Sequence, residues 1–201
     1  MPAPLGEIHH WLHDELAWLH IKWSDFRRLY ATGQERVDFL NATAPAFFNQ
    51  LQRMMWEDAL LHLCRITDPV KSVGHDNLTI MRIPDAIPDL ALRAGVKLLV
   101  DDAKQKSEFA RDWRNRRFAH RELPAFQGHV AAPLPPASRQ NVEDALAAVR
   151  NAMNHIERHY LHETVLYEHS IEPLGGVEAL IARLRKGIAA EKAERERKLG
   201  R

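Results

Sequence analysis

A short arginine-rich segment is the part of this sequence best suited to chemistry. Residues 109–121 hold five arginines against one acid, Asp112, a local charge of +4 (five minus one) in a chain of formal net charge +1. Guanidinium groups are planar, permanently charged and matched to phosphate oxygens, and His120 could move protons near neutral pH. The segment therefore predicts phosphate chemistry, and its arginines are Arg111, Arg114, Arg116, Arg117 and Arg121.

Helix geometry separates the two most reactive members of this segment. Arg114 and His120 are six residues apart, which on a straight α-helix is about 120° around the axis and roughly 9 Å along it. Three arrangements would still unite them: an irregular helix, an Arg114 side chain that reaches along the helix, or a site completed by a second subunit. A solvated basic helix face with a surface histidine is the competing interpretation.

The composition is that of an ordinary globular protein. The chain has 201 residues, of which 45% are hydrophobic and 27% charged, so we expect a single domain over residues 1–201. A net charge near zero excludes a global field that attracts nucleic acid. The single cysteine, Cys64, lies in an apolar pattern, and we expect a buried thiol in a reducing cytoplasm. No signal peptide or run of about 20 apolar residues is visible, so we expect a cytoplasmic protein outside the membrane.

Apolar residues recur at helical spacing through almost the whole chain. This pattern predicts an all-α fold, an antiparallel helical bundle of five to seven helices. Pro45 should break the second helical stretch, with Thr43 capping its longer half, and Ser138 should cap a later long helix. We also expect a proline-rich loop near residues 123–137 and a C-terminal helix over residues 177–198 with a frayed end.

The segment from Arg114 to His120 resembles the signature of the HEPN superfamily (higher eukaryotes and prokaryotes nucleotide-binding). That signature is an arginine, then a polar residue, here Asn115, and a histidine a few residues further on. The wider context is similar to the AbiU-like abortive-infection branch of HEPN proteins, over about residues 35–165. It comprises residues 40–48 and 63–69, Glu57-Asp58, Asn77-Leu-Thr79 and Phe118-Ala-His-Arg121.

The resemblance implies a metal-independent endoribonuclease whose site forms where two protomers of a homodimer meet. His120 would act as general base or acid, Arg114 would stabilise charge on the phosphate, and Asn115 would orient them. Arg111, Arg116, Arg117 and Arg121 would bind RNA. The product would carry a 2′,3′-cyclic phosphate, no cofactor would be needed, and the protein would act in phage defence or as a toxin with an antitoxin partner. Some HEPN proteins only bind a nucleotide, nucleic acid or protein partner, and that is the alternative function.

Histidines offer a third possibility, because the chain has twelve. His155, His159 and His162 follow i, i+4, i+7 spacing, and His9 and His13 are also four residues apart. Such pairs could make a metal-binding helical bundle. No Glu-x-x-His pattern accompanies them in register, so we expect surface or partly buried imidazoles and no metal.

Trp113 stands beside the arginines. It could stack on a nucleic-acid base, but core packing is the simpler interpretation.

Overall fold

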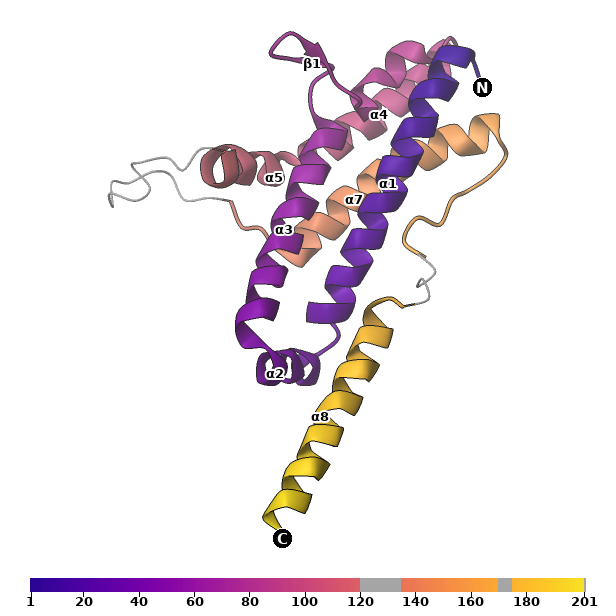
Figure 1. Cartoon of the computed structure of the whole chain (residues 1–201). Coiled ribbons are helices and arrows are strands. Elements are labelled where there is room, and N and C mark those ends of the chain that lie inside the picture. The colour runs from indigo at the N-terminus through magenta and orange to yellow at the C-terminus, as the bar shows by residue number, and fades with distance from the viewer. Residues whose placement is uncertain (120–134, 170–174, 201) are drawn as a thin grey trace.

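The computed structural model describes residues 1–119, 135–169 and 175–200 of the chain, and helices dominate all three ranges (Figure 1). The all-α prediction is confirmed. The α-helices are α1 (Ala3–Tyr30), α2 (Gln34–Thr43), α3 (Pro45–Thr67), α4 (Leu90–Lys106), α5 (Glu108–Trp113), α7 (Arg139–Tyr160) and α8 (Val177–Leu199). The short elements are strands β1 (Lys71–Ser72) and β2 (His75–Asp76), the 3₁₀ turns η1 (Ile80–Arg82) and η2 (Pro84–Ala86), and the π-helical segment η3 (Arg114–Ala119).

Helices α1 and α3 form one antiparallel pair, with α2 as the connection at one end. Gly33 has a φ of +145°, a conformation that side chains disfavour, and it allows the sharp turn between α1 and α2. As predicted, the helix breaks at Pro45, which begins α3 at a position where its missing N–H costs nothing. The Thr43 prediction is wrong. Thr43 still belongs to α2, and its hydroxyl donates to the carbonyl of Phe39 one turn back, so Ala44 is the N-cap.

Helices α4 and α7 lie side by side and supply much of the main core. The predicted cap of α7 is confirmed: Ser138 Oγ accepts from the backbone N–H of Asn141, whose side chain accepts in return from the N–H of Ser138. Fully buried apolar residues fill the contact, among them Val96, Val100, Ala103, Val142, Val149, Met153 and Ile156. This contact fixes the direction in which the rest of α7 faces α1.

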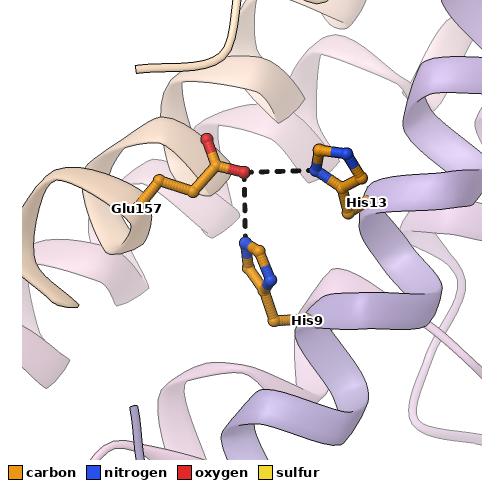
Figure 2. A group of neighbouring side chains, drawn as sticks. All are labelled: His9, His13 and Glu157. Carbon is orange, nitrogen blue, oxygen red and sulfur yellow. Dashed lines mark hydrogen bonds and ion pairs between the residues drawn. The ribbon is translucent and has the colours of Figure 1, made fainter. Parts of the chain in front are cut away.

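After α7 the chain turns back toward α1. Asn154 forms a two-way clamp with Val165, accepting from its N–H at 2.8 Å and donating to its carbonyl at 3.0 Å. The clamp places Tyr167 among buried residues, where its hydroxyl donates to Glu157 of α7. His9 and His13 of α1 reach the same carboxylate (Figure 2). A polar cluster therefore joins α1, α7 and the returning segment.

Helix α8 packs in a separate, smaller apolar cluster. Its Val177 and Ile181 contact the cluster formed by Leu29, Leu40 and Phe48, and Arg36 donates to both oxygens of Glu178. Helix α8 is helical to Leu199, and the frayed end expected for it remains a prediction. Division of the chain into a single domain remains a prediction.

Two connecting segments complete the description of the fold. The polar stretch after α3 holds β1 and β2, a two-stranded antiparallel sheet with only two residues in each strand. Most of the proline-rich loop near 123–137 lies outside the described residues; positions 135–137 have no regular secondary structure. Within the described ranges, every helix is too short or too polar to cross a membrane.

We predict that Asn154→Ala lowers the free energy of unfolding by about 1–3 kcal/mol, because the substitution leaves the Val165 N–H and carbonyl without their buried partner. Urea unfolding followed by circular dichroism measures the change. Asn151→Ala is the control, since Asn151 is exposed on the same helix, and it should stay within about 0.5 kcal/mol of wild type. Equal losses in both variants would contradict the clamp.

Candidate functional site

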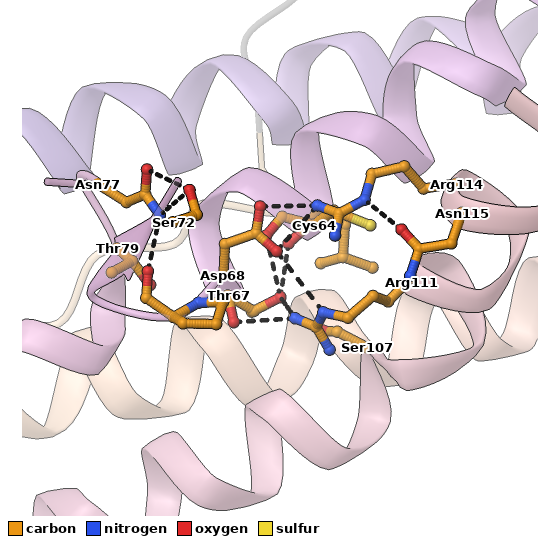
Figure 3. A network of polar contacts seen from close by, with 12 residues as sticks. Cys64, Thr67, Asp68, Ser72, Asn77, Thr79, Ser107, Arg111, Arg114 and Asn115 are labelled. Atoms are coloured by element: carbon orange, nitrogen blue, oxygen red, sulfur yellow. Dashed lines mark hydrogen bonds and ion pairs between the residues drawn. The ribbon is translucent and has the colours of Figure 1, made fainter. Parts of the chain in front are cut away.

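The carboxylate of Asp68, the residue directly after α3, contacts two arginines from the α5–η3 segment (Figure 3). Arg114 Nη1 donates to both Asp68 oxygens, at 2.9 and 2.7 Å. Arg111 Nε lies 3.5 Å from Asp68 Oδ1. Because all three side chains are at most a quarter exposed, these charge-assisted contacts are worth more than a surface ion pair. Asp68 thus fixes where Arg114 can be.

Arg111 also holds the end of α3. Its Nη2 donates to the Thr67 carbonyl at 2.9 Å and to the Thr67 hydroxyl at 3.2 Å. A cation at the C-terminus of a helix satisfies carbonyls that have no partner within the helix and complements the helix dipole. The structure therefore places this predicted phosphate-binding arginine in the joint between α3 and α5.

The segment after Asp68 is held by a polar network of its own. Thr79 donates to the carbonyl of Ile66 at 2.9 Å, and Asn77 Nδ2 donates to the carbonyl of Pro69 at 2.8 Å. Arg82 donates in turn to the carbonyls of Asn77 and Val70. These bonds close the loop around Asp68, so they account for the Asn77-Leu-Thr79 motif found in the sequence.

The helix that carries the candidate catalytic residues is irregular. From Arg114 to Ala119 it is a π-helix that follows α5 without a break, which is the first of the three arrangements considered above. Segments of π-helix are rare and often mark functional sites. Asn115 Oδ1 accepts from Arg114 Nε at 3.1 Å and so orients the guanidinium. His120 and Arg121 lie outside the described residues, so the pairing of Arg114 with His120 remains a prediction.

The remaining arginines do not all point toward Asp68. Arg117 is exposed and lies over the ring of Trp113, 5.1 Å from its centre, and Arg116 is half-buried. Trp113 and Arg117 border a cavity of about 570 Å³, with Arg53, Trp56 and Arg139 also among its lining residues. The arginines of this segment thus lie at two neighbouring positions: Arg111 and Arg114 contact Asp68, and Arg117 borders the cavity.

Cys64 lies beneath the arginine pair and is fully buried, as expected from the sequence. Burial raises the pKa of its thiol to about 11, although Arg114 and Arg111 oppose the shift. The thiol therefore stays protonated at neutral pH and is a poor nucleophile.

The three histidines singled out in the sequence do not share one helix face, because α7 ends at Tyr160 and His162 lies beyond it. His155 is half-buried near Gly95 of α4, while His159 and His162 are exposed. In the described ranges, the group that offers three ligand atoms within 4.8 Å of one another consists of His9, His13 and Glu157. This cluster takes one carboxylate from α7 and the i, i+4 histidine pair from α1.

Glu157 is ionised in this cluster. Burial alone would raise its pKa, but hydrogen bonds from His9 and Tyr167 outweigh burial and hold the pKa below the ordinary value. Burial, together with the bond to Glu157, raises the pKa of Tyr167, so the phenol remains a neutral donor. The sequence alone gave no sign of either residue's role.

Comparison with known proteins identifies the family. The HEPN AbiU2 family model matches residues 3–174. This chain belongs to the HEPN AbiU2 family. The HEPN AbiU2 match covers the Asp68–Arg114 contact and also α1, which the resemblance over residues 35–165 had not included, whereas α8 lies beyond it. The chain matches neither a curated protein nor a solved structure.

We predict that Asp68→Ala lowers the free energy of unfolding by about 1.5–3 kcal/mol, because two partly buried arginines lose a charged acceptor. Chemical denaturation of the variant and of wild type measures the change in the free energy of unfolding. Asp58→Ala is the matched control: Asp58 pairs with Lys22 at 2.6 Å, but half of its side chain is exposed, so the loss should stay below about 1 kcal/mol. A loss for Asp68→Ala no larger than the control's would show that Asp68 does not organise this joint.

Proposed function

We propose that this HEPN AbiU2 protein is a metal-independent endoribonuclease in which Arg114, Asn115 and His120 act on RNA. The observation that carries the proposal is the fixed position of Arg114, held by Asp68 on one side and Asn115 on the other. A charged donor that is already in place stabilises developing charge without further reorganisation. One quarter of the Arg114 side chain is exposed, so a phosphate can approach it.

The proposed reaction is an internal transfer within RNA. His120 takes the proton of a ribose 2′-OH, whose oxygen attacks the adjacent phosphorus while the bond from phosphorus to the 5′-oxygen breaks. The leaving oxygen takes up a proton, and Arg114 stabilises the negative charge on the phosphate. The products are a 2′,3′-cyclic phosphate and a 5′-hydroxyl.

The neighbouring cavity is a suitable place for an RNA base. It is within the size range of ligand pockets, and Trp113, which borders it, directly precedes Arg114 in the chain. Aromatic rings stack on bases of any sequence, and arginines neutralise the backbone. We propose that Trp56 and Trp113 contact a base next to the cleaved bond, while Arg53, Arg117 and Arg139 bind flanking phosphates. Arg116 and Arg121 are proposed to add to the same basic surface.

We further propose that the active form is a homodimer. Phe47, Met54 and Leu61 are exposed on α3 at steps of seven residues, which places them along one side of the helix. Asp68 directly follows the last residue of α3. A second copy packed on this stripe would cover exposed apolar surface and bring two Arg114–Asp68 contacts toward each other.

The biological role that fits is cytoplasmic phage defence or toxicity restrained by a partner such as an antitoxin. The similarity to abortive-infection proteins supports it, since RNA cleavage stops the growth of an infected cell.

We predict that the purified protein cleaves RNA in the presence of EDTA and leaves 2′,3′-cyclic phosphate ends. His120→Ala and Arg114→Ala should each lower the cleavage rate by about 10²–10⁴-fold, the usual contribution of a positioned acid or base or of a charge-stabilising donor. His159→Ala, an exposed histidine on α7, is the control and should cleave as wild type does. Cleavage that survives His120→Ala, or that requires added metal, would sink the nuclease proposal.

The cavity favours one second candidate, a HEPN module that binds a nucleotide or RNA without cleaving it. In that case wild type and His120→Ala bind RNA equally and neither cleaves it, while Arg117→Ala weakens binding and flattens its salt dependence. Fluorescence anisotropy at several salt concentrations, run beside the cleavage assay, separates the two functions.

We predict that Met54→Glu and Leu61→Glu convert a dimer to a monomer in sedimentation velocity experiments, because each buries a charge in the proposed contact. Leu98→Glu is the control, since Leu98 is also apolar and is even more exposed, but lies on α4. If the wild-type protein sediments as a monomer, or if all three variants remain dimers, the α3 stripe is not the interface.

A further inference from the structure

The cluster of His9, His13 and Glu157 has the spacing of a metal site (Figure 2). Glu157 Oε1 lies 3.1 Å from His9 Nε2 and 3.4 Å from His13 Nδ1. Ligand atoms bound tetrahedrally to zinc at 2.0–2.1 Å are about 3.3 Å apart. The Glu157 oxygen thus already stands near the distance from each nitrogen that a bound ion would impose, and all three ligand atoms lie within 4.8 Å of one another.

The hydrogen bonding of the carboxylate is uneven. His9, His13 and the Tyr167 hydroxyl all converge on Oε1, with the tyrosine closest at 2.6 Å. Glu157 is only 1% exposed, yet its Oε2 is buried without a hydrogen-bond partner in the described part of the chain. A buried acceptor without a partner is costly, and this oxygen is an unused ligand atom beside two imidazoles.

We propose that His9, His13 and Glu157 form a binding site for one divalent transition-metal ion, with zinc as the best match. Two imidazoles and one carboxylate are a common zinc donor set that leaves a fourth position open for water or another oxygen. Each histidine would bind through the nitrogen that now faces Glu157 and carry its proton on the other ring nitrogen. The Glu157 carboxylate can turn its second oxygen toward the ion.

The fold positions these ligands firmly. The His9–His13 pair comes from one face of α1, one helical turn apart, and Glu157 comes from the last turn of α7. Tyr167 lies 2.8 Å from His13 Nδ1 and is held there by the Asn154–Val165 clamp. A bound ion would therefore link α1 to α7. The site shares no residue with the Arg114 site, so the inference does not depend on RNA cleavage.

Zinc titration of the full chain, prepared without a histidine tag and stripped with a chelator, tests the proposal. We expect one Zn²⁺ per chain by competition with a chromophoric chelator. His13→Ala and Glu157→Gln should each weaken binding by at least about 100-fold, more than the loss of an outer-shell partner usually costs. Zinc should raise the melting temperature of wild type and of neither variant.

His10→Ala and His159→Ala are matched controls, because both histidines are exposed, on α1 and α7 respectively, and both variants should bind zinc as wild type does. X-ray absorption of zinc-loaded wild type supplies a readout that does not depend on how the variants fold, and we expect scattering from two imidazoles. Wild-type binding no tighter than that of Glu157→Gln, or a zinc spectrum without imidazole scattering, would overturn the site.

Discussion

The contact between Asp68 and Arg114 is the interaction on which the candidate active site depends. It ties the end of α3 to the beginning of η3, and Arg111 strengthens the same joint through Thr67. Without a carboxylate at this point, two arginines would face each other at partly buried positions and repel. The backbone loop around Asp68 is closed by hydrogen bonds from Asn77 and Thr79. The position of the Arg114 guanidinium is therefore set by residues at and after the end of α3, which lie outside the Arg114–His120 motif.

A second polar constraint lies between α1 and α7. Glu157 is almost completely buried, and its charge is stabilised by donors from α1 and from the segment that returns after α7. Apolar packing of α4 against α7 brings this carboxylate to the histidine pair, so the polar cluster depends on the core. The hydrogen bonds of the cluster in turn favour one alignment of α1 against α7. The two constraints use different helix surfaces, which lets the Arg114 site and the histidine cluster be changed separately.

The helices, their breaks and the family resemblance could be predicted from the sequence, because each depends on residues that are close together in the chain. Pro45 and Ser138 act on their own helix ends, and the Arg114–Asn115 motif is contiguous. Glu157 could not be found this way: it stands between His155 and His159, yet its partners are about 145 residues away on α1. Asp68 belonged to a recognised segment, but its role appears only when α5 crosses the end of α3. The sequence left the π-helix as one of three alternatives, because residue types alone do not determine its backbone hydrogen bonds.

The most direct test is a double-mutant cycle on single-turnover RNA cleavage with Asp68→Ala, Arg114→Ala and the double variant. If Asp68 acts by holding Arg114, its removal slows cleavage in the wild-type background but has almost no further effect once Arg114 is gone, so the two losses are strongly non-additive. Losses that add fully, or an Asp68→Ala protein that cleaves as fast as wild type, would contradict a site organised by this contact.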